Sequence, residues 1–439
     1  MNEKYTVIVG LGKTGFSCAK FCLRENKLFA VTDSRDNPPY AAELKAIAPQ
    51  VKMVFGQLDE ALILSAEKII ISPGVSLKEP VLQKAIAQGI SYVGDIELFV
   101  ERIQAPICAI TGANAKSTVT TLVGEMAKAS GLKTQVAGNI GTPVLDLLTE
   151  PVSDLYVLEL SSFQLETTFS LKAKAATILN VSEDHMDRYA SMDEYRAAKL
   201  RIYDHCEIAV INRADPRIAP ADKNIKTISF GLSPSARGYG FEKIREEYYL
   251  TRNGAPILNI KEMKMVGKHN AENALAALAL GEALSLDQAA MLNTLRTFPG
   301  LPHRCEFVAE TEGVAFYNDS KGTNVGATIA ALEGLGQEKN ILWIAGGRGK
   351  GADFTPLRES VRKQVRCAIL LGEDAEKLSA ALKGCCSIIH VDSMKEAVQY
   401  AKREATAGDL VLLSPACASL DMFDNYEHRG EVFKRCILE

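Results

Sequence analysis

The amino-acid sequence predicts an α/β protein of three domains, each built on a mainly parallel sheet flanked by helices. Two observations lead to this fold class. Short apolar runs alternate with amphipathic stretches along the chain, and the runs end in small or turn-forming residues. With 439 residues, the chain is also longer than a single domain usually is. We expect domains at residues 1–94, 95–299 and 300–439.

The predicted strands fall into three groups. They lie at 6–12, 28–34 and 68–74, then at 107–111, 154–162, 175–183 and 207–213, and finally at 316–320, 341–347, 366–372, 387–392 and 409–415. The stretch from about 225 to 265 alternates apolar and polar residues around Asn253 and Gly254, which predicts hairpins at the edge of the second sheet. Residues 270–284 predict a helix with a largely apolar face, and the proline-rich stretch 298–304 predicts a hinge.

Composition and charge exclude several classes of function. The 50 basic and 54 acidic residues leave a net charge of -4 without a long basic run, so nucleic acid is not an expected partner. No apolar stretch approaches the roughly 20 residues that span a bilayer, and the early strand at residue 6 argues against a signal peptide. The ten cysteines lack zinc-site or disulfide spacing, and Cys18 and Cys22 are expected to be buried thiols. We therefore expect a cytoplasmic protein without a membrane partner.

A glycine-rich turn follows the first predicted strand. Gly10, Gly12 and Gly15 form the pattern GxGxxG between this strand and a helix, and Asp33 ends the next strand. This context is typical of a Rossmann-like nucleotide-binding unit, in which the helix N-terminus faces a diphosphate. Read alone, the motif favours NAD-dependent redox chemistry, and a purely structural turn remains an alternative.

A second phosphate-binding motif opens the second group. The segment from Thr111 to Thr118 lies between a strand and a helix and carries Lys116 and Ser117. A P-loop-type ATPase uses such a loop to hold phosphates with backbone N–H groups, a lysine, and a hydroxyl that binds Mg²⁺. The strict pattern is not met, because Ile110 occupies the position of its first glycine. A chance Lys-Ser pair is the alternative, but two phosphate sites in one chain argue against a dehydrogenase.

Further polar residues follow strands near this loop. Glu159 ends one strand and His185 follows the next. The carboxyl ends of parallel strands meet at one edge of a sheet, so both side chains are candidate metal ligands, with solvated or capping residues as the alternative. In the third group, the loops 346–351 and 414–419 are candidate anion-binding loops or simple turns. No Gly-x-Ser-x-Gly nucleophile elbow is present.

Taken together, these motifs resemble those of the Mur ligase family along essentially the whole chain. The strings that carry the resemblance are TGANAKST from Thr111, GNIG from Gly138, ELSSFQLE from Glu159, EDHMDRY from Glu183, YRAAKLRIY around Lys199, GKHN from Gly267, LPHR ending at Arg304, NDSKGTN from Asn318, GGRGKGADF from Gly346 and SPACASLD from Ser414. Within the family, ELSSFQLE and SPACASLD are most similar to the branch that adds D-glutamate. The resemblance implies ATP-dependent addition of D-glutamate to UDP-N-acetylmuramoyl-L-alanine in peptidoglycan precursor synthesis, through an acyl phosphate and a tetrahedral intermediate.

The same resemblance implies roles for residues in the first two domains. The UDP part of the substrate would bind to Thr14, Asp33, Ser34, Arg35, Ser72, Pro73, Gly74 and Asn139. ATP would bind to Gly112, Asn114, Lys116, Ser117, Thr118, Asn270, Arg304, Asp319 and Lys321. The expected catalytic residues are Lys116, Glu159, His185 and Lys199.

For the metals and the amino acid, the resemblance implies two Mg²⁺ (or Mn²⁺) ions and one modified lysine. Ser117 and Glu159 would hold one ion, and His185 and Lys199 the other, with Lys199 carbamoylated by CO₂. From the residues alone, Lys199 reads as an ordinary exposed helix lysine. D-glutamate would bind to Asp184, His185, Thr323, Lys350, Ser419, Leu420 and Tyr426. The general base is left open between Asp184 and His185.

The sequence departs from the family pattern at two of these positions. Ala115 replaces a glycine, which adds strain of about 1 kcal/mol if this residue has a positive φ. Tyr426 replaces a common phenylalanine, and this exchange should be mild. The alternatives to the ligase are an NAD-dependent dehydrogenase and an inactive nucleotide-binding regulator, the latter suggested only by Ala115. We expect a monomer.

Overall fold

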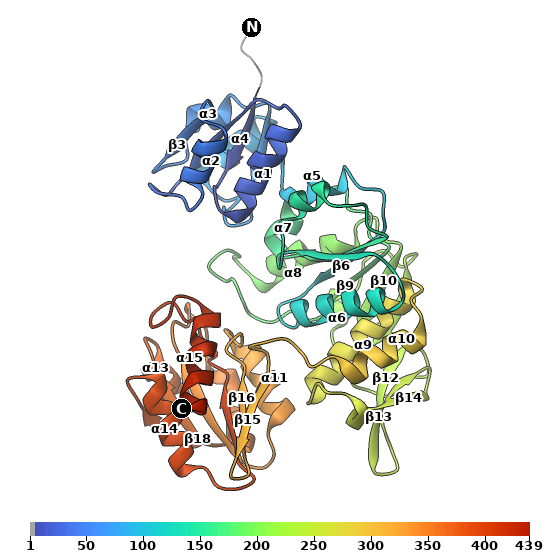
Figure 1. The fold of residues 1–439 in the computed structure, drawn as a ribbon, viewed down its shortest axis with the longest axis vertical. Coiled ribbons are helices and arrows are strands. Elements are labelled where there is room, and N and C mark those ends of the chain that lie inside the picture. Colours follow the sequence, from blue (N-terminus) through green and yellow to red (C-terminus); the bar gives the residue numbers. More distant parts are fainter. Residues whose placement is uncertain (1–4) are drawn as a thin grey trace.

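The computed structural model describes residues 5–439, so the first four residues of the expected N-terminal domain lie outside it. Its elements form three α/β units, which Figure 1 shows in blue, in cyan to yellow, and in orange to red. The predicted fold class is confirmed, because each unit contains a mainly parallel sheet covered by helices. No helix among the described residues is long and apolar enough to cross a membrane.

The N-terminal unit contains a five-stranded parallel sheet in the order β3-β2-β1-β4-β5. Its central strands are almost fully buried and rich in valine and isoleucine, as expected for a parallel sheet covered on both faces. Its strands are β1 (Thr6–Val9), β2 (Phe29–Asp33), β3 (Lys52–Phe55), β4 (Lys68–Ile71) and β5 (Ser91–Val93). Its helices are α1 (Lys13–Arg24), α2 (Ala41–Ile47), α3 (Glu60–Leu64) and α4 (Pro80–Ala87).

The central unit contains a six-stranded parallel sheet in the order β11-β10-β9-β6-β8-β7. The strands are β6 (Ile107–Thr111), β7 (Thr134–Gly138), β8 (Leu155–Glu159), β9 (Ala175–Ile178), β10 (Ile208–Asn212) and β11 (Lys226–Phe230). The helices are α5 (Asp95–Val100), α6 (Lys116–Ala129), α7 (Ser162–Glu166), α8 (Met192–Leu200), α9 (Lys268–Ala283) and α10 (Gln288–Thr297), with the 3₁₀ helix η1 at Val144–Thr149.

The prediction of edge hairpins at 225–265 is only partly right. The segment Lys226–Phe230 is β11, which pairs in parallel with β10 and forms the sheet edge. The following strands, β12 (Tyr239–Ile244), β13 (Glu247–Arg252) and β14 (Ala255–Asn259), form a separate antiparallel sheet beside α9. Alternation of polar and apolar residues predicts the hairpins correctly but carries no information about which sheet they join.

The C-terminal unit contains a six-stranded sheet in the order β15-β16-β20-β17-β18-β19. Only the edge strand β15 is antiparallel to its neighbour. The strands are β15 (Glu306–Thr311), β16 (Val314–Asn318), β17 (Ile341–Gly346), β18 (Val365–Leu371), β19 (Ser387–His390) and β20 (Leu410–Leu413). The helices are α11 (Val325–Leu335), α12 (Arg358–Gln364), α13 (Ala375–Leu382), α14 (Met394–Glu404) and α15 (Tyr426–Leu438).

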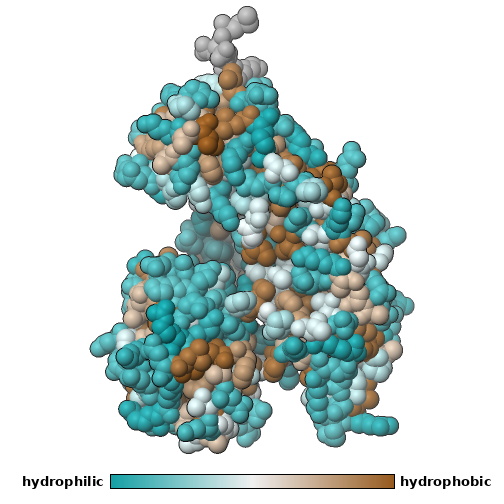
Figure 2. Space-filling view, in the orientation of Figure 1, coloured by the Kyte–Doolittle hydropathy of each residue, from teal (hydrophilic) through white to brown (hydrophobic). Residues whose placement is uncertain are grey.

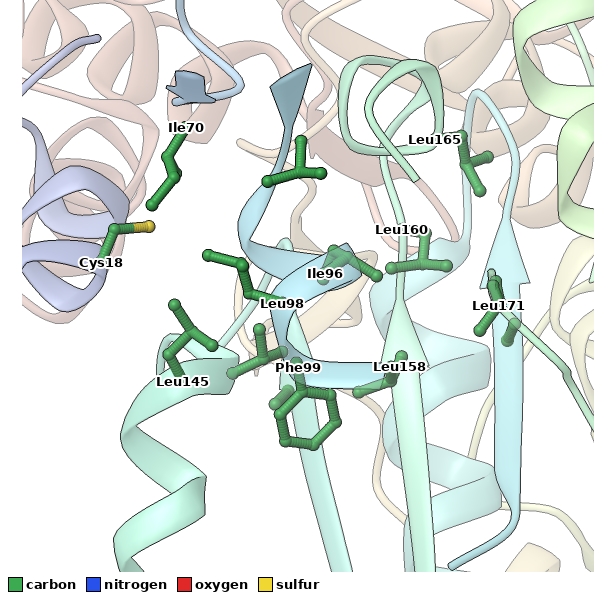
Figure 3. Close-up of a cluster of buried hydrophobic side chains, with 14 of the residues drawn as sticks. Cys18, Ile70, Ile96, Leu98, Phe99, Leu145, Leu158, Leu160, Leu165 and Leu171 are labelled. Carbon is green, nitrogen blue, oxygen red and sulfur yellow. The ribbon is translucent and has the colours of Figure 1, made fainter. Parts of the chain in front are cut away.

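The N-terminal and central units share one hydrophobic core. Figure 3 shows Cys18 of α1 and Ile70 of β4 beside Leu98 and Phe99 of α5, and the same cluster continues to Leu158 of β8. The clusters of the C-terminal unit contain only residues of that unit. Figure 2 shows a recess between the N-terminal and C-terminal units, with largely hydrophilic rims. Buried apolar area therefore fixes the first two units to each other more firmly than the third.

Candidate functional site

The phosphate loop connects β6 to α6 as predicted. Ala115 has φ 65° and ψ -4° directly before the helix, so the left-handed conformation considered for this position is present. The ammonium of Lys116 donates to the carbonyl oxygens of Gly112 and Ala113, each at 2.9 Å. Burial lowers the pKa of Lys116, and the nearby Glu159 opposes this shift. Such a loop presents N–H groups and a cation at a helix N-terminus, which suits an anion.

Glu159 lies at the end of β8 and is only 1% exposed. Its Oε1 accepts a hydrogen bond of 2.8 Å from the side-chain amide of Asn139, whereas its Oε2 has no hydrogen-bond partner among the described residues. A buried carboxylate oxygen without a partner costs free energy unless a donor or a cation satisfies it. The environment of Glu159 therefore fits a bound metal ion.

Lys199 is buried beneath the phosphate loop, which corrects its interpretation as an exposed lysine. It is 1% exposed, and its Nζ donates to the carbonyl oxygen of Gly112 at 2.9 Å and to Oγ1 of Thr111 at 3.3 Å. Burial, followed by the nearby Lys116, lowers the pKa of Lys199 well below its ordinary value. The helical period of α8 places Lys199 on the side of the helix that packs against the phosphate loop. The burial of Lys199 depends on this tertiary packing alone.

His185 and Asp184 lie in the loop between β9 and α8. His185 has φ 58°, and the edge of its ring contacts the ring of Phe163 with 4.9 Å between centroids. Burial is the main cause that lowers the pKa of His185, so the imidazole is neutral near pH 7 and keeps a lone pair for a metal. Oδ2 of Asp184 accepts from the amide of Asn324 at 3.3 Å, which joins the loop to the C-terminal unit.

No group of three or more His, Cys, Asp or Glu side chains within residues 5–439 is arranged to hold a metal. Glu159 and His185 are the only residues of these types in the predicted ligand set. The other two expected ligands, Ser117 and Lys199, are residues of other types. An ammonium group has no lone pair for a cation, whereas a carbamate offers oxygen ligands.

The glycine-loop cavity lies between the N-terminal and central units and measures about 620 Å³. Its lining includes all eight residues predicted to bind the UDP group: Thr14, Asp33, Ser34, Arg35, Ser72, Pro73, Gly74 and Asn139. Oδ2 of Asp33 accepts from the backbone N–H of Leu11 at 2.7 Å, which fixes the glycine turn to β2. A Cβ on Gly15 would lie 1.9 Å from the carbonyl oxygen of Gly10, so this turn requires glycine.

The phosphate-loop cavity, of about 120 Å³, lies between the central and C-terminal units. Six of the nine predicted ATP ligands line it, and Gly112, Lys116 and Ser117 belong to the adjoining loop. The six are Asn114, Thr118, Asn270, Arg304, Asp319 and Lys321. Arg304 donates to Oγ of Ser117 at 2.7 Å and so connects the predicted hinge to the phosphate loop. Burial raises the pKa of Asp319 to about 7.

The Lys350 cavity, of about 270 Å³, brings together four of the seven residues predicted to bind D-glutamate. Asp184, His185, Thr323 and Lys350 line it. The other three are not part of its lining. Ser419 is buried, Leu420 is 61% exposed, and the ring of Tyr426 lies 3.5 Å from Nζ of Lys321. The structure thus brings four of the seven expected residues together and leaves the other three outside this cavity.

Several lining residues were missed by the sequence analysis. His269 and Asn273 line the phosphate-loop cavity from the first turns of α9, next to the predicted Asn270. Asn324 bridges Asp184 and Asn114 across the two units. His269 and Asn324 belong to the strings GKHN and NDSKGTN, so a wider reading of these strings would have found them, whereas Asn273 lies three residues beyond GKHN.

Fold and site together define a nucleotide-binding α/β protein with a phosphate loop between two further cavities. Three family models match consecutive parts of the chain: "Mur ligase MurD-like, N-terminal domain" at residues 4–94, "Mur ligase middle domain" at 110–281 and "Mur ligase, glutamate ligase domain" at 303–417. The chain belongs to the Mur ligase family.

Curated relatives match over the full length. A UDP-N-acetylmuramoylalanine--D-glutamate ligase of Coxiella burnetii (strain Dugway 5J108-111) is 52% identical over 99% of both chains. A protein of the same name from Pseudomonas syringae pv. syringae is 49% identical, over 100% of this chain and 98% of its own. Among solved structures, the UDP-N-acetylmuramate-alanine ligase MurC of Thermotoga maritima has a TM-score of 0.61 at 18% identity and covers 99% of both chains. This last likeness concerns the fold alone.

Proposed function

We propose that this protein is an ATP-dependent ligase that joins D-glutamate to UDP-N-acetylmuramoyl-L-alanine. The observation that carries the proposal is a phosphate loop with the buried Glu159 and Lys199 beside it, together with three cavities lined by residues expected to bind the three substrates. Full-length relatives at about half identity carry the name of this activity. The alternatives, a dehydrogenase and an inactive regulator, have no support among these relatives, and the regulator would not need the buried Glu159 and Lys199.

Each of the three cavities binds one of the three substrates. The glycine-loop cavity holds the uridine diphosphate group, and its lining includes Asn139, which also donates to Glu159. ATP occupies the phosphate loop and its cavity. The Lys350 cavity receives D-glutamate, because the cationic Lys350 and the neighbouring N–H groups suit a dicarboxylate.

In the first step, the terminal carboxylate of the acid substrate attacks the γ-phosphorus of ATP, and ADP leaves. A carboxylate is a poor electrophile, and the acyl phosphate that forms has phosphate as its leaving group. Lys116 holds the phosphates in line and offsets charge on the transferring group. In the second step, the amine of D-glutamate attacks the acyl carbon, a proton passes to Asp184 or His185, and phosphate leaves from the tetrahedral intermediate.

Two Mg²⁺ ions would neutralise phosphate charge during both steps. Ser117 and Glu159 would hold one ion, which fits the buried Oε2 of Glu159 that lacks a hydrogen-bond partner within residues 5–439. His185 and a carbamate on Lys199 would hold the other. The low pKa of Lys199 favours the neutral amine, which adds to CO₂ and releases one proton. The enzyme is expected to act in the cytoplasm as a monomer.

Phosphate release from ATP tests this function. Purified protein is given UDP-N-acetylmuramoyl-L-alanine with D-glutamate, with L-glutamate or without an amino acid. Release that needs both the nucleotide substrate and D-glutamate is the expected result. Release that depends on a different amino acid would mean that the protein is a Mur ligase with another substrate. No release in any mixture would refute the proposal and favour the inactive nucleotide-binding regulator.

A further inference from the structure

The loop from Ser182 to Ser191 touches both neighbours of the central unit. On one side Asp184 accepts a hydrogen bond from Asn324 of the C-terminal unit. On the other side Arg188 reaches the N-terminal unit, and Lys78 of that unit donates to the carbonyl oxygen of Arg188 at 3.0 Å. The same loop carries His185 in the Lys350 cavity. One segment is therefore in contact with the parts of the protein that we assign to UDP and to D-glutamate.

Arg188 binds the backbone turn that lines the glycine-loop cavity. Its Nη1 donates to the carbonyl oxygen of Gly74 and its Nη2 to that of Val75, each at 3.2 Å. Gly74 and Val75 both line this cavity, and the turn also contains Ser72 and Pro73. A planar guanidinium that holds two consecutive carbonyls fixes both their distance and their direction, which a lysine does not do.

Arg188 also packs against Phe163, whose ring contacts the imidazole of His185. The guanidinium carbon lies 4.2 Å from the ring centroid of Phe163, and the ring of Phe163 contacts His185 edge-on at 4.9 Å. His185 has a positive φ, a conformation that persists only where neighbouring groups support it. Removing the guanidinium would leave one face of Phe163 without its partner and loosen the support of the imidazole.

We propose that Arg188 is a positioning residue that connects the turn of the UDP-binding cavity to His185 through the ring of Phe163. Binding of the UDP group orders the turn, the turn fixes Arg188, and Arg188 holds the loop 182–191 in its catalytic conformation. The acid substrate thereby helps to assemble the site at which its own carboxylate reacts. This inference rests on the proposed ligase function for its kinetic part, and on UDP binding in the glycine-loop cavity for its structural part.

Hydrogen exchange with UDP as the only ligand tests the structural part. UDP should lower amide exchange both in the turn 72–75 and in the loop 182–191 of the wild-type protein. In Arg188→Met, UDP should still protect the turn, and the protection of residues 182–191 should disappear. The matched control is Arg217→Met, because Arg217 is an exposed arginine that forms a local ion pair with Asp215. The control should behave like the wild type. Equal protection of the loop in Arg188→Met would overturn the inference.

Kinetics test the functional part. Arg188→Met should lower kcat by about 10- to 100-fold, as expected for a displaced catalytic group, and should change the Kd of UDP by less than about threefold. The kcat of Arg188→Lys should lie between those of the wild type and Arg188→Met. If Arg188→Met does not fold, Phe163→Leu tests the same connection, because it keeps both carbonyl contacts of Arg188 and removes only the ring between Arg188 and His185. Unchanged kcat in both variants would also overturn the inference. An inactive wild type would refute the ligase function instead and leave the exchange result valid.

Discussion

Replacing Ala115 with glycine tests whether the phosphate loop contains backbone strain. At φ 65°, an alanine costs about 1–2 kcal/mol relative to its preferred conformations. Glycine removes this cost, but its freedom in the unfolded chain costs about 0.5–1 kcal/mol, and loss of the half-buried methyl group costs up to about 0.8 kcal/mol. The net change in the free energy of unfolding should therefore be small.

Ala113 is the matched control two residues away in the same loop. It is 7% exposed and does not have a positive φ. Ala113→Gly therefore loses the buried methyl group and gains chain freedom without relief of strain, which should destabilise the protein by about 1.5 kcal/mol. The free energies of unfolding of the two variants should differ by about 1–2 kcal/mol, with Ala115→Gly the more stable.

Urea unfolding followed by far-UV circular dichroism measures this difference. Tryptophan fluorescence is unsuitable, because the single tryptophan, Trp343, lies in β17 of the C-terminal unit. Ala115→Gly should also bind ATP at least as tightly as the wild type, because glycine adopts the loop conformation freely. Equal destabilisation by the two substitutions would show that the loop is not strained at Ala115 and would refute the reasoning.

Three further predictions concern charged groups around the phosphate loop. Lys199→Ala should lower kcat by at least about 100-fold, with partial recovery in formate, and full activity without it would contradict the carbamate. Arg304→Met should raise the KM for ATP about tenfold through loss of the contact with Ser117, and should leave the Kd of UDP unchanged by calorimetry. The raised pKa of Asp319, about 7 against 3.8, means that its contribution to stability is complete below about pH 4 and is lost as pH rises through 7. Asp319→Asn should flatten this fall in urea midpoints of ligand-free protein, and an unchanged slope would show that Asp319 is not its source.

Local patterns in the sequence predicted the phosphate-binding parts of the site well. A strand, a glycine-containing turn and a helix follow one another within about ten residues, so short-range hydrogen bonds and periodicity suffice to place Gly10, Gly15 and Lys116. The eight residues assigned to the UDP group come from four separate segments, and all line one cavity. Their assignment depended on the family resemblance rather than on periodicity.

The features that the sequence did not predict depend on packing between segments far apart along the chain. The amino-acid sequence by itself determined the inner strands of the three main sheets and the order of the three α/β units, because each follows from the neighbours of a residue along the chain, whereas the edge strands β3, β5, β7 and β15 were not predicted. Only the tertiary structure decided that Lys199 is buried, that Ser419, Leu420 and Tyr426 lie outside the Lys350 cavity, and that the first two units share a core. These features depend on which surfaces pack against each other in the folded protein. The free energy of this packing comes from burial of apolar area contributed by segments far apart in the sequence.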